Sequence, residues 1–152
     1  MSDYTVQLFV GVGPVRLGMS RDEVRRAMPE ASESFRKTPT SPHGTDSFHQ
    51  SGFQVFYEGQ EPMVEYIELS RDSGFRAHYR DLDVFATPAD EVAAYIARDA
   101  AFDETAREFP YSYIFPGLQL SLWRPVLPED DEAGRYFSTI GIGRKGYYDE
   151  MG

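Results

Sequence analysis

A glycine-rich string near the end of the chain has the residue types of a dinucleotide-binding site. Residues 141–146 read Gly-Ile-Gly-Arg-Lys-Gly, which matches the fingerprint whose backbone approaches a pyrophosphate. That chemistry requires a helix directly after the glycines, because the helix N-terminus binds the phosphates. Six residues follow Gly146, too few for such a helix. We therefore predict the end of a strand and a flexible turn here, and no nucleotide cofactor.

The histidines and carboxylates lack the spacing of a metal site. The three histidines are His43, His49 and His78, and no two of them are four residues apart, as they would be on a zinc-binding helix. A metal site formed by His43, His49 and the intervening Asp46 is the alternative. The other interpretation is that one of the two histidines lies in a surface loop and the other on a strand, with no metal. Cysteine is absent, which excludes thiol nucleophiles, and no nucleophile-elbow motif occurs. We expect no metal, no cofactor and no enzymatic activity.

Aromatic residues are unusually frequent and suggest a binding surface. The chain has ten Tyr, eleven Phe and one Trp. Side chains alternate between two faces after each predicted helix, which is typical of strands with one buried face. We expect Phe53, Val55, Leu118 and Leu120 to face the helices. The candidate partner-binding residues face away from them: Gln54, Phe56, Tyr66, Glu68, Gln119 and Trp123. The alternative is that the two half-sheets close on each other, or form one continuous sheet, and bury these side chains.

A second candidate contact is an acidic run between Pro128 and Gly134. It consists of Glu129, Asp130, Asp131 and Glu132. A solvated loop between strands is the simpler interpretation, and an acidic finger that docks on a cationic protein is the other. The formal net charge of the chain is −10. That charge argues against nucleic acid and anionic lipid as partners and suits a basic protein.

Two helix starts are expected. Ser20 and Glu23 form a capping box, and Val24 and Met28 give the following helix one apolar stripe before Pro29 ends it. Its arginines (Arg21, Arg25 and Arg26) lie opposite that stripe, so we expect a solvated face, with a contact surface for an acidic ligand as the alternative.

The second helix is expected to begin at Thr87. Pro88 would occupy the favoured first-turn position, and Asp90 would be the reciprocal acceptor of the cap.

The two halves of the chain share an order of features. Residues 52–55, Gly-Phe-Gln-Val, recur as residues 117–120, Gly-Leu-Gln-Leu, and residues 22–24, Asp-Glu-Val, recur as residues 90–92. We therefore predict an α+β fold of two tandem modules, residues 1–75 and 76–152. Each module would be a helix packed on an antiparallel three- to four-stranded sheet, and the two would form one compact unit.

The first helix start resembles a known type of module. Residues 13–24, Gly-Pro-Val-Arg-Leu-Gly-Met-Ser-Arg-Asp-Glu-Val, are similar to the opening of the modules in beta-lactamase inhibitory proteins and in the small lipoproteins of the barrel-assembly machinery. Bacterial tandem-module families, some of them immunity-like, open in the same way. The resemblance implies a non-enzymatic protein with no catalytic residues. The exported relatives carry an export signal, and the inhibitory proteins carry disulfides, whereas this chain has neither feature.

These observations predict a non-enzymatic protein-binding module. The specific hypothesis is an immunity-type inhibitor that occludes a partner toxin or enzyme, with a basic toxin as the candidate partner. The N-terminal residues do not form a signal peptide, and no apolar stretch approaches the ~20 residues of a membrane span, so we expect a cytoplasmic protein. The alternative function is a small-molecule carrier or sensor with a pocket between the two modules. The oligomeric state is left open.

Overall fold

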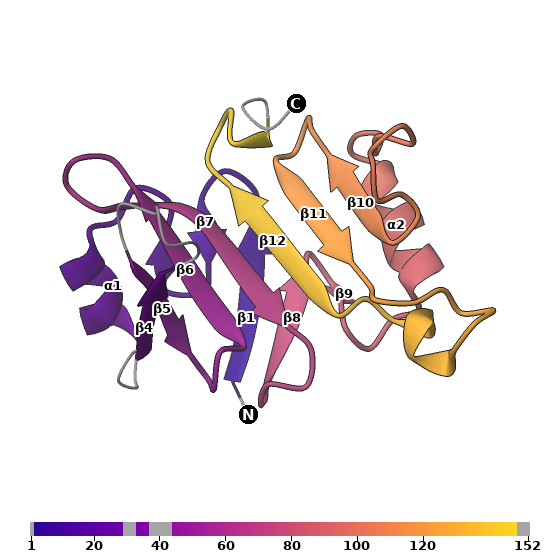
Figure 1. Ribbon diagram of the computed structural model, residues 1–152, viewed down its shortest axis with the longest axis horizontal. Helices are drawn as coiled ribbons and strands as arrows, with labels where there is room; N and C mark the ends of the chain where they lie inside the picture. The colour runs from indigo at the N-terminus through magenta and orange to yellow at the C-terminus, as the bar shows by residue number, and fades with distance from the viewer. Residues whose placement is uncertain (1, 29–32, 37–43, 149–152) are drawn as a thin grey trace.

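Most of the ordered structure is β-sheet, in two sheets that are packed together (Figure 1). The computed structural model describes residues 2–28, 33–36 and 44–148. In these residues the small sheet has the strand order β3-β2-β1-β8-β9, and the large sheet has the order β10-β11-β12-β7-β6-β5-β4. The strands of the small sheet are β1 (Ser2–Gln7), β2 (Gly11–Val12), β3 (Val15–Arg16), β8 (Phe75–Tyr79) and β9 (Leu82–Asp83). The strands of the large sheet are β4 (Glu33–Arg36), β5 (Gly44–Phe48), β6 (Phe53–Glu58), β7 (Met63–Ser70), β10 (Ser112–Phe115), β11 (Leu120–Trp123) and β12 (Thr139–Gly143).

The helices are short: α1 (Arg21–Ala27), α2 (Ala89–Ala97) and the 3-10 helix η1 (Glu132–Arg135). The predicted α+β fold of two modules, each a helix on its own three- to four-stranded sheet, is wrong. β7 and β12 pair antiparallel, with Ile67 opposite Ile142, so the strands of both halves form one large sheet. Each half-sheet alone would leave a strand edge with unpaired backbone groups, and the pairing satisfies both edges.

The small sheet also joins segments that are distant in sequence. β1 pairs in parallel with β8, with Tyr4 opposite Ala77. The division of the chain into modules of residues 1–75 and 76–152 stays a prediction. Its boundary falls directly after the first residue of β8.

The core lies between the two sheets and continues under α2. Phe53, Val55 and Ile67 of the large sheet are fully buried and belong to one apolar cluster with Ala77 of the small sheet and Ile96 of α2. Phe53 and Val55 thus point into the core as the alternation predicts, but this core is shared with the small sheet and is not formed by the helices alone. In Figure 1 the small sheet, α1 and α2 lie behind the large sheet, and no helix of the described residues covers its front.

The start of α1 is confirmed. Ser20 is the N-cap and accepts a hydrogen bond from the backbone N–H of Glu23, while the Glu23 carboxylate accepts one from the N–H of Ser20. The hydrogen bond from the Ser20 backbone N–H, with a further contribution from the Ser20 hydroxyl, lowers the pKa of the Glu23 carboxyl. The helix ends with Met28 as the C-cap, and Pro29 lies outside the described residues.

The predicted start of α2 is wrong. The N-cap is Pro88 and not Thr87, and no side chain caps the helix. Since the helix begins one residue later than expected, Asp90 is the second helical residue and does not return a bond to the cap. Its carboxylate lies 3.8 Å from the guanidinium of Arg124 instead.

The solvated face expected for α1 is present at Arg25 and Arg26, which are exposed, but Arg21 and Arg25 also bind residues of the large sheet. Arg25 donates from Nε and Nη2 to the two carboxylate oxygens of Asp46, at 3.2 and 2.9 Å, and the Tyr57 hydroxyl donates to Asp46 at 2.7 Å. Arg21 donates to the Gly44 carbonyl and lies over the Tyr57 ring, 4.6 Å from its centroid. Asp46 is 0% exposed. These residues, the Asp46 cluster, join α1 to β5 and β6.

Replacement of Asp46 by Ala tests this anchor. Arg25 and the Tyr57 hydroxyl would lose their acceptor, and a hydrogen bond to a charged group contributes about 1.5–3 kcal/mol. We expect the free energy of unfolding, measured by urea denaturation, to fall by about that amount.

Asp81→Ala is the matched control. Asp81 is an exposed aspartate outside the Asp46 cluster, so its removal should change the free energy by less than about 0.5 kcal/mol. Equal losses in the two variants would contradict an anchoring role for Asp46.

Candidate functional site

The outer face of the large sheet is the surface opposite the core. Gln54 pairs with Glu68 and Phe56 with Tyr66 across β6 and β7, and each alternates with core residues. Glu68 in turn lies opposite Gly141 of β12, which lies opposite Ser121 of β11. The structure thus brings residues from both halves of the chain to one side of the sheet.

A groove of about 320 Å³ is formed on this face beside β11. It is referred to below as the outer groove, and its lining residues are Tyr66, Glu68, Arg107, Glu108, Ser112, Ile114, Ser121, Leu122, Trp123, Tyr147 and Tyr148. Three sequence candidates therefore meet in it: Tyr66, Glu68 and Trp123. Gln54, Phe56, Gln119 and the acidic run are not among its lining residues.

Trp123 is the exposed aromatic residue of the groove. It is the single Trp of the chain and is 38% exposed, although it stands on a strand with paired neighbours on both sides, Ser112 and Thr139. An indole of this size left in water forgoes a large burial energy. Exposed Trp side chains are enriched among the residues that contribute most to protein interfaces.

Tyr66, Tyr147, Tyr148 and Ser121 form a tyrosine cluster at the floor of the groove. The Tyr66 ring stacks on the Tyr147 ring with 4.7 Å between centroids and 18° between planes. The Tyr148 hydroxyl lies 2.9 Å from the Tyr66 hydroxyl and 2.7 Å from the Ser121 hydroxyl. The segment after β12 therefore turns back over the sheet and builds one wall of the groove.

Sequence reasoning missed Tyr147 and Tyr148, although the glycine string was a usable signal. A Cβ at Gly141 would lie 1.8 Å from the Tyr66 hydroxyl, and a Cβ at Gly143 would lie 2.6 Å from the Tyr147 Cβ. The glycines of this string thus let aromatic rings lie against the backbone of β12. The predicted strand end is confirmed, since β12 ends at Gly143 and a turn follows.

The remaining sheet candidates have other contacts. Gln119 is buried; its side-chain amide donates to the Pro116 carbonyl at 2.6 Å, and its side-chain oxygen accepts from the Tyr148 N–H at 2.7 Å. It therefore positions the wall of the outer groove. Phe56 is buried with its ring 5.7 Å from that of Tyr66, and Gln54, which is partly exposed, donates to the Ser51 carbonyl.

The acidic run lies in the loop between β11 and β12, and all four of its side chains are exposed. Asp131 caps η1 by accepting from the Ala133 N–H at 2.9 Å. The loop is held by Arg124, which is 3% exposed and donates to the carbonyls of Gly134 and Pro110. These hydrogen bonds hold the backbone of the acidic loop in a defined position. The acidic surface that the loop forms is separate from the outer groove.

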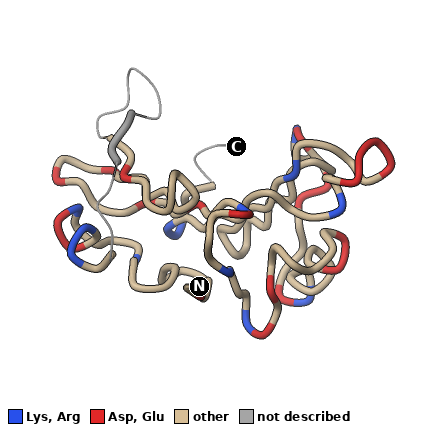
Figure 2. Tube along the Cα trace, turned by 90° about the horizontal axis from the view of Figure 1, so that it is seen from below, with Lys and Arg blue, Asp and Glu red and all other residues tan. Residues whose placement is uncertain are grey.

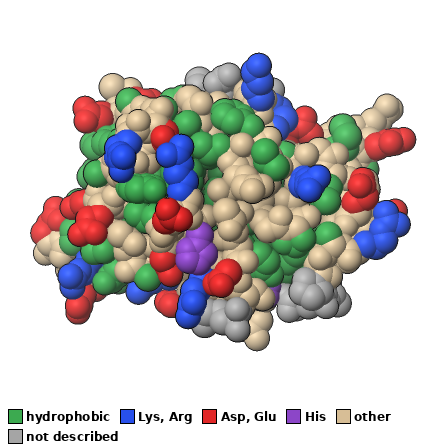
Figure 3. All heavy atoms as spheres, turned by 180° about the vertical axis from the view of Figure 1, so that it is seen from behind, with side chains coloured by type: hydrophobic (Ala, Val, Ile, Leu, Met, Phe, Trp, Pro, Cys, Tyr) green, Lys and Arg blue, Asp and Glu red, His purple; other side chains and the backbone are tan. Residues whose placement is uncertain are grey.

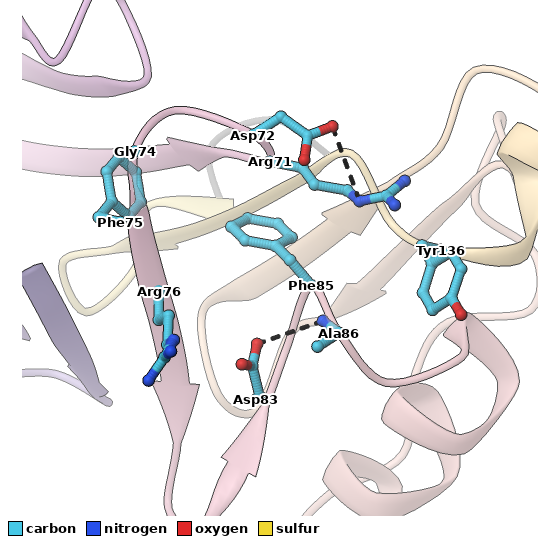
Figure 4. A pocket seen from close by; sticks show the side chains of 9 residues that line it. All are labelled: Arg71, Asp72, Gly74, Phe75, Arg76, Asp83, Phe85, Ala86 and Tyr136. Atoms are coloured by element: carbon cyan, nitrogen blue, oxygen red, sulfur yellow. Dashed lines mark hydrogen bonds and ion pairs between the residues drawn. The ribbon is translucent and has the colours of Figure 1, made fainter. Parts of the chain in front are cut away.

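A second cavity, of about 460 Å³, lies at the turn from β7 to β8, between the two halves of the chain. Figure 4 shows Arg71 pointing toward Tyr136 while Arg76 points away from it. The Arg71 guanidinium lies 4.6 Å above the Tyr136 ring, and Asp83 accepts from the Ala86 N–H at 3.2 Å. The remaining lining residues are Asp72, Gly74, Phe75 and Phe85. The cavity thus has two basic and two acidic side chains that do not converge on one point.

Charges are distributed over the whole molecule. Figure 2 shows acidic positions at both ends of the long axis of the molecule. Figure 3 shows acidic, basic and apolar side chains interspersed over the back face. Among the described residues no group of three or more metal-ligating side chains occurs, and His43 lies outside them. His49 accepts from or donates to the Tyr4 hydroxyl at 2.7 Å. None of the helices in the described ranges is sufficiently long and apolar to cross a membrane.

The tyrosine cluster should make stability fall at alkaline pH. Burial raises the pKa of Tyr148 to about 12, with a further contribution from the negative charge of Glu68, and burial raises the pKa of Tyr66 well above its usual value. The folded state thus keeps protons that the unfolded chain loses near pH 10. We expect the free energy of unfolding to be unaffected by these groups below about pH 10 and to fall as the pH rises toward 12.

Denaturation at a series of pH values checks this prediction. In Tyr148→Phe the fall between pH 10 and 12 should be shallower than in the unmodified protein. Identical slopes in the two proteins would contradict the assignment.

Comparison with models of known protein families finds no match to this chain, and neither the search of curated proteins nor the search of solved structures finds a similar protein. The resemblance to tandem-module proteins is therefore supported by residues 13–24 alone. The outer groove is the structural feature from which a function can be proposed.

Proposed function

We propose that this protein is a non-enzymatic protein-binding module that covers a basic partner with the outer face of its large sheet. The observation that carries the proposal is the exposed Trp123 in a groove on a sheet face that no helix of the described residues covers. The specific form is an immunity-type inhibitor that occludes a toxin or enzyme. This form also draws on the resemblance of residues 13–24 to inhibitory and immunity-like modules.

The groove has the composition of an interface centre. Trp and Tyr rings provide large rigid contact areas, and they lie beside polar groups that give orientation. The aromatic wall is already held in place: Tyr148 is fixed through both its backbone and its hydroxyl, and Tyr147 through its stack on Tyr66. A wall that is ordered before binding costs little conformational entropy when a partner docks.

The charge of the chain supports a basic partner. A net charge of −10 attracts a cationic protein over distances of about a Debye length and raises the association rate. The acidic run contributes to this attraction from outside the groove, where it would form part of a polar rim. Such rim charges affect the association rate more than the affinity.

The cavity at the β7–β8 turn is the place for the alternative, a small-molecule carrier or sensor. Its volume falls within the range of about 300–1,000 Å³ for ligand pockets. The outer groove is favoured because it contains the exposed Trp123, whereas the charged side chains of the other cavity do not converge on one point.

Affinity capture tests the proposal. The tagged protein is used as bait in a lysate of the organism that encodes it, at low salt, and bound protein is eluted by raising the salt concentration. We expect one stoichiometric partner whose activity the purified protein inhibits. Trp123→Ala should weaken binding by about tenfold or more, the range of interface hot-spot residues.

Phe9→Ala is the matched control, because Phe9 is another exposed aromatic residue and is not part of the groove. It should bind and inhibit like the unmodified protein. A partner that binds Trp123→Ala with full affinity would contradict the proposal. A thermal shift with a metabolite that Trp123→Ala preserves, without any protein partner, would favour the carrier instead.

A further inference from the structure

We propose that the outer groove receives one large apolar side chain of the partner, and that basic residues of the partner flank this anchor. This inference rests on the proposed function and deepens it, because it names the kind of residue that the groove recognises. It follows from the shape of the groove, from the contacts that its polar groups make within the protein and from the charge of the segment beside it.

Ser121 in the floor of the groove is a small residue among larger ones. Ile114 lies opposite it on β10, and Trp123 stands two residues further along β11, on the same face of the sheet. Tyr148 comes from the segment after β12, and its hydroxyl lies 2.7 Å from that of Ser121. A small side chain surrounded by larger ones leaves a hollow on the sheet, and a hollow of this kind is where a side chain of a partner fits.

Trp123 is exposed because its neighbours across the sheet are small. Ser112 on β10 and Thr139 on β12 lie directly opposite it, and neither side chain covers an indole. Trp123 is therefore 38% exposed, and Ile114 beside it is partly exposed. An apolar occupant of the groove would remove both side chains from water, which is the main favourable contribution to association.

The hydroxyl groups in the floor use one another as hydrogen-bond partners. The Tyr148 hydroxyl lies 2.9 Å from that of Tyr66 and 2.7 Å from that of Ser121, and the Tyr66 and Ser121 hydroxyls are 3.0 Å apart. Each of the three hydroxyl protons therefore has an acceptor inside the cluster. A polar occupant would have to replace one of these hydrogen bonds, whereas an apolar occupant leaves all of them in place.

The other polar side chains of the groove are engaged or hydrated. The Ser112 hydroxyl donates to the Glu108 carboxylate at 3.1 Å, and Glu68 interacts within the protein. Arg107 is exposed, so its guanidinium stays in water when the groove is filled. Because a polar group that is buried without a partner costs free energy, these contacts favour an occupant that has no polar group.

The size of the groove limits the anchor to one residue. At about 320 Å³ the groove lies at the lower end of the range of about 300–1,000 Å³ for ligand pockets. It has room for one large side chain and not for a helix, which is about 10 Å wide. The rest of the partner would contact the face of the sheet around the groove.

The segment before β10 determines which residues suit the surroundings of the anchor. Residues 103–108 contain three acidic side chains and one basic side chain. This segment lies along β10, because the Asp103 N–H donates to the Ile114 carbonyl at 2.8 Å. Its other end is held by the Ser112 N–H, which donates to the Glu108 carbonyl at 3.0 Å. Residues beside the anchor would therefore meet an excess of negative charge, to which Lys or Arg is complementary.

Nuclear magnetic resonance provides a direct test, because the single Trp of the chain gives a single indole N–H signal. The probes are two capped peptides of equal charge, Lys-Lys-Phe-Lys-Lys and Lys-Lys-Ala-Lys-Lys, titrated into the isotopically labelled protein at low salt. We expect the Phe peptide to shift the indole signal and the amide signals of Ile114 and Ser121 in a saturable way. The Ala peptide should bind about tenfold more weakly, the ratio expected when one large apolar side chain is buried.

Equal affinity of the two peptides would overturn the inference, since binding would then depend on charge alone. Shifts confined to residues outside the groove would overturn it as well. A third peptide, Glu-Glu-Phe-Glu-Glu, tests the flanking residues and should bind about tenfold more weakly than Lys-Lys-Phe-Lys-Lys at low salt. If it binds equally well, the basic flanks are wrong.

Ile114→Glu separates apolar recognition from attraction between charges. The variant adds a negative charge, so attraction alone would tighten the binding of Lys-Lys-Phe-Lys-Lys. A carboxylate in the wall of an apolar site should instead weaken it, by about tenfold. Val10→Glu is the matched control, because Val10 is an exposed aliphatic residue outside the groove, and it should change the affinity by less than about twofold. Unchanged or tighter binding to Ile114→Glu would contradict the inference.

Capture of the protein partner separates this inference from the proposed function. If Ile114→Glu captures the partner with full affinity while Trp123→Ala does not, the apolar anchor is wrong and the protein-binding function stands. If Trp123→Ala captures the partner with full affinity, the proposed function itself fails. Loss of capture in both variants, with folding confirmed by circular dichroism, supports the two together.

Discussion

The antiparallel ladder between β7 and β12 is formed by strands from the two halves of the chain, and the candidate site depends on it. Ile67 and Ile142 meet across this ladder on the core side. On the opposite side the same register sets Glu68 beside Gly141, and through Gly141 beside Ser121 of β11. A shift of one residue would exchange the faces of β12 and place isoleucines on the outer face. The apolar core therefore fixes the register, and the register assembles the outer groove.

Buried charged groups hold the peripheral elements on this framework. Asp46 joins α1 to β5, and Arg124 joins the loop that carries η1 to the end of β11 through backbone carbonyls and through contacts with the rings of Tyr113 and Phe137. Each group is expensive to bury and is tolerated because its hydrogen bonds are made within the protein. This arrangement gives the loops defined positions, which apolar contacts of short elements alone would not provide.

Local patterns in the sequence were sufficient for some features and insufficient for others. The capping box at Ser20 and the alternation at Phe53 depend on neighbouring residues, so they could be predicted. The pairing of β7 with β12 could not, because strand pairing is set by contacts between distant segments. The roles of Arg25 and Tyr148 were missed for a similar reason: each side chain reaches a partner on another strand, Asp46 in one case and Tyr66 in the other. Trp123 was found because strand alternation alone determines which face it occupies.

The pairing of internal charges decides where the unpaired acidic charge lies. Arg25 pairs with Asp46 and Arg144 with Glu58, so each pair uses one positive and one negative charge and leaves the net charge at −10. The acidic run, in contrast, is fully exposed. A cationic protein would therefore be attracted by charge that lies at the surface, and the groove beside Trp123 offers apolar contact on the same molecule.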